Sequence, residues 1–199
     1  MSRYSGSDPY LDSSGVLKNR LGIGDETTLE QAEADIVAAR SFELAQDPLP
    51  GGFDLAHLRG IHKRLFGDVY DWAGQLRTVD ISKGGNNFAH HAHLEHAAAK
   101  IFQQLAEEHH LAGLNPDGFA ARAAHYMGEL NALHPFREGN GRAQREFISH
   151  LAQVNGYYVA WEGIDGAALL AASIASFHGD TSRLAKLIRE SLVPLPQKE

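Results

Sequence analysis

The segment His134-Pro-Phe-Arg-Glu-Gly-Asn-Gly-Arg-Ala-Gln-Arg145 carries an imidazole, a carboxylate, a glycine-bracketed asparagine and spaced arginines within twelve residues. Apolar residues recur at helical spacing on both sides of it. Those before the segment are Phe119, Ala123, Tyr126 and Leu130, and those after it are Phe147, Ile148, Leu151 and Val154. The segment is therefore predicted to be a turn that joins two helices of the core.

The glycines of this turn predict a site for an anion. Gly139-Asn-Gly141 lies where the second helix is expected to begin, near Arg142. Glycine lets the backbone turn sharply and approach a ligand closely. The first amides of a helix have no internal partner and favour an anion. Arg142 and Arg145 are three residues apart, so both can bind successive phosphates from one helix face through forked hydrogen bonds.

Two other side chains of the segment suit the transfer of a phosphoryl group. Glu138 would be repelled by phosphate unless a cation intervened, and Mg²⁺ is usually shared between one carboxylate and substrate phosphates. A neutral imidazole such as that of His134 is suited to removing a proton near neutral pH. Each feature alone is more often structural, but their conjunction in one window favours a catalytic site. The sequence has no Walker-type phosphate loop.

Length and composition limit the classes of protein. The chain has 199 residues, 43% hydrophobic content and no cysteine, which suits one globular domain and excludes disulfides and thiolate metal sites. A net charge of −7 argues against broad electrostatic binding of nucleic acid. No run is long enough for a membrane span, and the opening residues lack the apolar core of a signal peptide. We expect a cytoplasmic protein with no membrane contact and a protein or small-molecule partner.

Helix signals occur along most of the chain, and the predicted fold class is all-α. Thr28-Leu-Glu-Gln31 has the pattern of a capping box for a helix to about Ala45. Asp54 and Asn115 are expected to cap later helices. The remaining expectations are an irregular arm at 1–26, one domain at 27–193 with its core at about 54–193, helices near 167–177 and 181–193, and a frayed tail at 194–199.

One stretch departs from the helical pattern. Arg77–Ile81 alternates polar and apolar residues, Ser82–Asn87 is rich in turn residues, and Phe88–His90 can return antiparallel. We therefore predict a short β-hairpin. Because such a pair is marginal by itself, it must lie against the helical body.

Segment 134–145 resembles the signature of Fic-domain proteins, His-x-Phe-x-Asp/Glu-Gly-Asn-Gly-Arg-x-x-Arg, at every specified position. The resemblance covers roughly Asp54 to Val193. It implies a Fic-type helical core with a short β-hairpin flap beside the active-site loop, and transfer of AMP from ATP to a hydroxyl of a target protein. The upstream residues that resemble the segment before the family's flap are Asp71-Trp-Ala-Gly74, Arg77, Ile81-Ser-Lys-Gly84 and Phe88.

The resemblance also implies a role for each residue of the segment. His134 would deprotonate the target hydroxyl, and Glu138 would hold Mg²⁺ between the α- and β-phosphates. Arg145 would meet the γ-phosphate. The residues expected to bind the nucleotide are Gly139, Asn140, Gly141, Arg142, Arg145 and, from the flap, Lys83.

Glycine at position 141 distinguishes between the reactions of the family. Doc-type members, which phosphorylate, carry lysine there, so Gly141 favours nucleotidyl transfer. ATP is the usual nucleotide donor of the family, although no residue of the motif is specific for adenine. The alternatives are another Fic-type phosphotransfer, with a different nucleotide, phosphocholine transfer or kinase activity, and a non-catalytic binding module.

The resemblance extends to target docking and to regulation. An open edge of the flap at Thr78–His90 could pair with an extended target segment. Many Fic proteins carry an inhibitory Ser/Thr-x3-Glu-Gly/Asn helix, but no Ser or Thr here has Glu four residues later. The chain thus resembles Fic toxins held by a separate small antitoxin that supplies the glutamate. Bacterial members of that class modify type II topoisomerase subunits, which are the expected targets.

The histidines at positions 90, 91, 93 and 96 have His-x-His and His-x-x-His spacings that also occur in metal sites. No cysteine or nearby carboxylate cluster completes a tetrahedron, and Glu95 alone is not enough. The sequence therefore favours a solvated or target-facing segment over a metal site.

Overall fold

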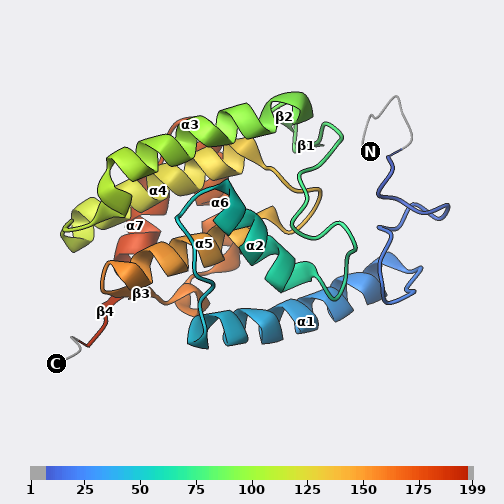
Figure 1. The fold of residues 1–199 in the computed structure, drawn as a ribbon, viewed down its shortest axis with the longest axis horizontal. Helices are drawn as coiled ribbons and strands as arrows, with labels where there is room; N and C mark the ends of the chain where they lie inside the picture. The colour runs from blue at the N-terminus through green and yellow to red at the C-terminus, as the bar shows by residue number, and fades with distance from the viewer. Residues whose placement is uncertain (1–7, 197–199) are drawn as a thin grey trace.

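The computed structural model describes residues 8–196, which are mostly helical with two small sheets (Figure 1). The helices are α1 (Glu26–Gln46), α2 (Leu55–Phe66), α3 (Leu94–Glu107), α4 (Pro116–Leu133), α5 (Asn140–Val154), α6 (Gly166–Phe177) and α7 (Ser182–Ser191). The strands are β1 (Ser82–Lys83) paired with β2 (Asn86–Asn87), and β3 (Tyr157–Val159) paired with β4 (Leu192–Pro194), both antiparallel. The predicted helical architecture with a short hairpin is confirmed.

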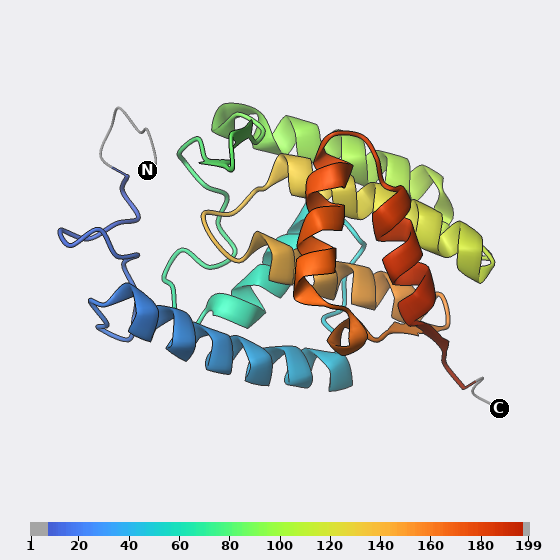
Figure 2. The same cartoon turned by 180° about the vertical axis from the view of Figure 1, so that it is seen from behind.

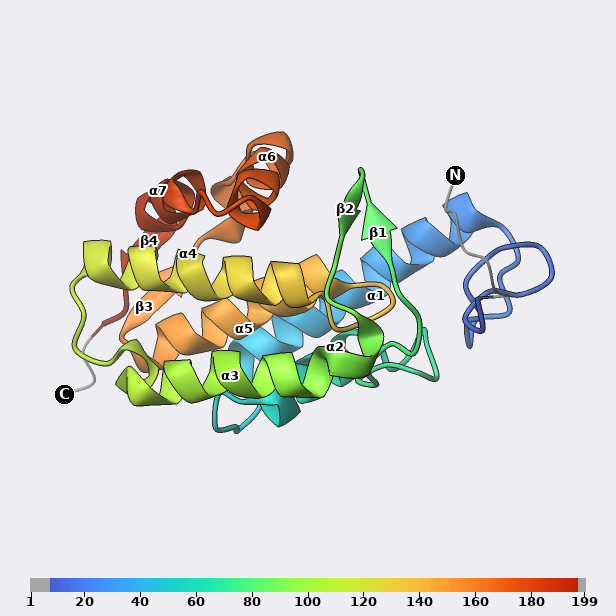
Figure 3. The same ribbon diagram turned by 90° about the horizontal axis from the view of Figure 1, so that it is seen from above.

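The core forms around α4, which contacts α3, α5, α6 and α7. Helices α6 and α7 cover the face of α4 that is opposite α3, as Figures 2 and 3 show. Helix α1 lies along the outer side of α2. The largest fully buried side chains include Tyr126, Phe66, Phe119, Phe136 and Phe147. Phe136 comes from the turn between α4 and α5, so the core itself anchors that turn.

Two of the three predicted helix caps are confirmed. Asp54 and Asn115 each accept a hydrogen bond of 2.8 Å from the amide three residues later. The predicted cap at Thr28 is wrong, because α1 already begins at Glu26. Asp25 caps that helix by accepting from the amide and the hydroxyl of Thr28, at 2.8 and 2.6 Å.

The hairpin is shorter than predicted and lies inside the segment that was expected to be only its turn. Gly84 and Gly85 both have positive φ, 59° and 84°, which suits a tight two-residue connection. The predicted strand at Arg77–Ile81 does not form, because the Arg77 amide donates to the carbonyl of Pro135 at 2.9 Å. The hairpin is thus attached to the α4–α5 turn instead of to a longer ladder.

Two further features differ from the predictions. Helix α3, which follows the hairpin, was not predicted from the histidine-rich stretch. Pro194 pairs with Tyr157, and the Leu195 amide donates to Gly156 at 2.8 Å, so ordered structure extends past the expected start of the tail. Residues 1–7 and 197–199 of the arm and tail lie outside the described residues. No helix within 8–196 is both long and apolar enough to cross a membrane.

Candidate active site

The turn between α4 and α5 is shaped by the side chain of Asn140. Its Oδ1 accepts from the Phe136 amide at 2.9 Å, and its Nδ2 donates to the Phe136 carbonyl at 2.8 Å. Asn140 is almost fully buried. Because both of its polar atoms are used within the loop, the contact that it can offer a ligand is its backbone N–H.

The backbone N–H groups that open α5 could serve as a cradle for an anion. The backbone N–H groups of residues 140–142 have no hydrogen-bond acceptor within residues 8–196. Gly139 precedes them at φ 79°, and a Cβ there would lie 2.3 Å from the Phe66 ring. A Cβ at Gly141 would meet only Arg145 Nη1, at an ordinary 3.7 Å. The fold therefore requires glycine at 139, whereas at 141 the missing side chain leaves room for a ligand.

The two arginines of α5 have different surroundings. Arg142 Nη2 lies 2.5 Å from Glu33 Oε1, and its guanidinium is 4.7 Å from the Phe66 ring centre. Arg145 makes no hydrogen bond or ion pair within the described part of the chain. Burial lowers the pKa of Arg145. A partly buried guanidinium that has no partner within residues 8–196, beside amides without an acceptor there, favours an anionic ligand.

Glu33 is a buried carboxylate that α1 contributes to the site. Besides Arg142, it accepts a hydrogen bond from the Tyr70 hydroxyl. Burial, followed by this hydrogen bond, raises the pKa of Tyr70. Glu33 thus fixes Arg142 from outside the signature segment, and the sequence analysis missed it. A signal was present, since Glu33 shares the buried stripe of α1 with Leu29 and Val37.

His134 ends α4 in the left-handed conformation, at φ 46° and ψ 61°. Its Nδ1 is 3.1 Å from the Asn131 carbonyl. Because a carbonyl only accepts, Nδ1 carries the proton and Nε2 keeps the lone pair. The Phe88 ring stacks on the imidazole at 3.8 Å. Burial lowers the pKa of His134 to about 4, so the imidazole is neutral at pH 7 and can accept a proton.

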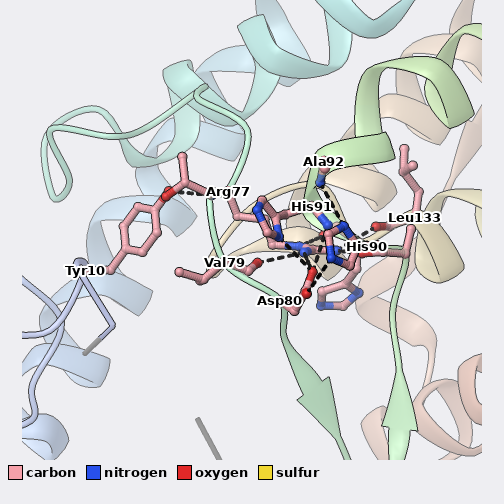
Figure 4. Close-up of polar contacts among 11 residues, drawn as sticks. Tyr10, Arg77, Val79, Asp80, His90, His91, Ala92 and Leu133 are labelled. Carbon is pink, nitrogen blue, oxygen red and sulfur yellow. Dashed lines mark hydrogen bonds and ion pairs between the residues drawn. The ribbon is translucent and has the colours of Figure 1, made fainter. Parts of the chain in front are cut away.

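Arg77 joins the base of the hairpin to the turn between α4 and α5. Its buried guanidinium donates to the carbonyls of His134 at 2.8 Å, Val79 at 2.7 Å, Leu133 at 3.4 Å and Ala89. Figure 4 shows it between the two ends of the hairpin and α4. Arg77 thereby fixes the carbonyl of the strained His134 and the segment that carries Phe88.

A second buried histidine supports the turn from α2. His62 Nε2 donates to the Glu138 carbonyl at 2.9 Å, and the Gly74 amide donates to His62 Nδ1 at 2.9 Å. The imidazole stacks on Phe136 with ring centres 3.8 Å apart. Burial lowers the pKa of His62 to about 4. His62 was not predicted as a site residue, because it lies within the buried stripe of α2.

Glu138 and Lys83 lie at the open side of the site. Glu138 is about half exposed, and its Oε1 accepts from the Gly139 amide at 2.8 Å and lies 3.6 Å from Arg142 Nη2. One accessible carboxylate beside an anion cradle fits Mg²⁺ shared with phosphate oxygens. Lys83 is exposed on β1, and its charge is a minor cause of the lowered pKa of His134. It makes no hydrogen bond or ion pair with residues 8–196.

Comparison with known proteins identifies the family of the chain. The sequence matches the Fic/DOC family over residues 52–152. The protein adenylyltransferase VbhT of Bartonella schoenbuchensis is 50% identical over 96% of this chain, which spans only 41% of VbhT. The probable protein adenylyltransferase Fic of Escherichia coli is 43% identical over 90% of this chain and 89% of its own length.

A solved structure has a similar fold. The crystal structure of BepC from Bartonella tribocorum, with bound AMPPNP, superposes with a TM-score of 0.89 at 28% identity. The match covers 94% of this chain and 97% of that chain. The likeness therefore includes α1 and the C-terminal helices, beyond the segment that matches the family.

Measuring the pKa of His134 would test whether the imidazole is shielded from water. We expect NMR titration to give a midpoint near 4, and Phe88→Ala to raise it toward the ordinary value of about 6.5 by exposing the ring. The exposed Phe42 provides the matched control, since Phe42→Ala should leave the midpoint unchanged. Because the unfolded chain binds this proton first, the contribution to stability is present above about pH 6.5 and is lost as the pH falls toward 4. A wild-type midpoint near 6.5 would contradict the burial argument.

The two glycines of the turn should respond in opposite ways. Gly139→Ala adds a clash and a strained φ, so we expect it to lower the free energy of unfolding by about 2–4 kcal/mol. Gly141→Ala should keep or slightly raise stability, as alanine favours a helix, but weaken the binding of a non-hydrolysable ATP analogue. Urea unfolding and calorimetry measure the two effects. Equal stability of the two variants would refute the distinction.

Glu33→Gln removes the charge that holds Arg142. We expect a loss of about 1–3 kcal/mol in unfolding free energy. The KM for ATP should rise about fivefold with a smaller change in kcat, because Arg142 is misplaced for binding. Glu30→Gln, at an exposed position of the same helix, is the control. If both variants share the wild-type KM, Glu33 does not position the arginine.

Proposed function

The chain belongs to the Fic/DOC family, and from this premise we propose that it is a protein adenylyltransferase, which transfers AMP from ATP to a hydroxyl of a target protein with His134 as the base. The observation that carries the proposal is the neutral imidazole of His134, with its Nε2 lone pair free, beside an α5 cradle that lacks an acceptor. A base and an anion site thus adjoin on one short turn.

The phosphates of ATP would bind at the N-terminus of α5. The free amides of residues 140–142 and the guanidinium of Arg142 supply donors for the inner phosphates. Arg145, unpaired within 8–196, would bind the γ-phosphate. The open space at Gly141 would let the phosphate chain lie directly on the backbone. This favours nucleotidyl transfer over the phosphorylation carried out by family members with lysine at this position.

The reaction would proceed by attack of the target hydroxyl oxygen on the α-phosphorus. His134 Nε2 takes the hydroxyl proton as the new O–P bond forms, and the bond to the bridging oxygen breaks to release pyrophosphate. The fixed tautomer matters, because the hydrogen bond from Nδ1 to Asn131 keeps the lone pair at Nε2. Arg142 and the amides would stabilise the charge that develops on the phosphate.

Glu138 would hold a magnesium ion, which would supply positive charge beside the phosphates of ATP. The half-exposed carboxylate meets the requirement of one protein ligand at the mouth of the cradle. Its present contact with the Gly139 amide also keeps it close to the bound phosphates. Lys83 would add a positive charge from the flap.

The flap would register the target by strand addition. The hairpin of β1 and β2 has an exposed edge, and Phe88 directly after it covers His134. An extended target segment paired with this edge would place its hydroxyl near Nε2 through main-chain hydrogen bonds, with little demand on sequence.

A role as the toxin of a toxin–antitoxin pair extends the proposal. The sequence has no Ser or Thr with Glu four residues later, and Glu33 pairs with Arg142 rather than Arg145. Arg145 thus stays available for a glutamate supplied by a separate small antitoxin. The proposed targets are type II topoisomerase subunits of bacteria.

The test is an adenylylation assay with purified chain, Mg²⁺, labelled ATP and purified type II topoisomerase subunits. We expect the target to gain the mass of one AMP residue, and His134→Asn to lower the rate by at least about a hundredfold. Asparagine tolerates the left-handed backbone better than alanine, so the variant should fold. His96→Ala, an exposed histidine of α3, is the control.

The outcomes separate the alternatives. A phosphate or phosphocholine adduct would indicate a different Fic reaction, and equal labelling by His134→Asn would exclude His134 as the base. In cells, expression of the wild type but not of His134→Asn should arrest growth if the chain is a toxin. Labelling of lysate proteins other than topoisomerases would retain the activity and reject the proposed target.

A further inference from the structure

The hairpin brings one carboxylate next to two adjacent histidines that lie at least ten residues further along the chain. Asp80 lies just before β1, and His90 and His91 lie just after β2. Asp80 Oδ1 is 3.0 Å from His91 Nδ1, and Asp80 Oδ2 is 3.1 Å from His90 Nε2. In Figure 4 both imidazoles point toward the carboxylate. We call these three residues the flap-base cluster.

We propose that the flap-base cluster binds one divalent transition-metal ion of the zinc class. One ligand atom from each residue can be chosen so that all three lie within 4.8 Å of one another. Two ligands of a tetrahedral zinc ion, with bonds of about 2.0–2.1 Å, lie about 3.3 Å apart. Small side-chain rotations therefore suffice to place the three atoms around one ion.

The donor set selects the kind of metal. Two imidazoles and one carboxylate are ligands that zinc uses in open sites, where water takes the fourth position. Mg²⁺ prefers six oxygen ligands, so the cluster differs in chemistry from Glu138. The side chains of Asp80, His90 and His91 are between about a third and a half exposed, which leaves a path for the ion and its water ligand. The carboxylate that the sequence analysis found missing is thus Asp80, ten residues upstream.

Asp80 is already held in place as an ionised ligand. Its Oδ1 accepts from the His91 amide at 2.8 Å, and this bond lowers the pKa of Asp80. The guanidinium of Arg77 lies 3.7 Å away and opposes a cation. Since Arg77 is also bound to backbone carbonyls, its charge remains near the site. We therefore expect weaker binding than at a closed site with four protein ligands.

Binding requires a tautomer change that can be observed. His90 Nδ1 accepts from the Ala92 amide at 3.2 Å, so the proton of the metal-free ring is on Nε2 and is donated to Asp80. When Nε2 binds the ion, the proton moves to Nδ1 and the contact with Ala92 breaks. The Ala92 amide is thus a reporter of ligation at His90.

The place of the cluster suggests what the ion would do. It would tie the segment entering β1 to the segment leaving β2, across the base of the flap. Phe88, which covers His134, lies between the ligands in sequence. A bound ion would therefore limit the movement of the hairpin and keep the imidazole covered.

The test is calorimetric titration of the chelator-treated full chain with Zn²⁺, in excess Mg²⁺ to occupy Glu138, and with Co²⁺ as a spectroscopic probe. We expect one ion per chain, visible Co²⁺ absorption, and a shift of the Ala92 amide in NMR. Asp80→Asn, which can still accept from the His91 amide, and His91→Ala should each lower affinity at least about tenfold. The exposed His96→Ala is the matched control.

The readouts do not depend on enzyme activity. Wild-type affinity in both Asp80→Asn and His91→Ala would overturn the site, as would the lack of one-to-one binding in the wild type. Equal loss in His96→Ala would show that the ion binds surface histidines without selection. Thermal unfolding in chelator, measured for each variant, must match the wild type before the affinities are compared.

Discussion

The buried guanidinium of Arg77 is the interaction on which the site depends. It binds carbonyls from the end of α4 and from both sides of the hairpin, so one side chain satisfies several backbone groups that would otherwise be buried without partners. The left-handed backbone of His134 and the ring of Phe88 keep their positions through it. Without this guanidinium, the hairpin segment and His134 would lose the side-chain hydrogen bonds that hold them in fixed positions relative to each other.

The turn itself is rigid for a different reason. Asn140 uses both ends of its amide on one residue of the loop, and His62 holds the Glu138 carbonyl from α2. These groups are buried, so breaking their hydrogen bonds costs free energy, because water cannot replace the lost partners. The cradle is therefore formed before a ligand arrives, which lowers the ordering cost of binding.

Most residues of the candidate site could be named from the sequence, because they lie within twelve consecutive residues. Caps such as Asp54 were also predictable, since a cap depends on neighbours in sequence. The start of α1 was not predictable, because Asp25 caps the helix in place of Thr28. The limits of the hairpin were not predictable either, because the Arg77 amide binds the turn between α4 and α5. Glu33 and Asp80 escaped notice for a related reason: a carboxylate acquires its partner only when distant segments fold together.

The contribution of α1 has a consequence for how such enzymes diverge. The family match begins at residue 52, yet Glu33 lies upstream and holds Arg142, the signature arginine proposed to bind phosphate. Changes in this helix could retune nucleotide affinity while every signature residue stays the same. Two proteins with identical motifs need not work at the same cellular ATP level, and a recombinant fragment trimmed to the family boundaries would misreport the affinity of the whole.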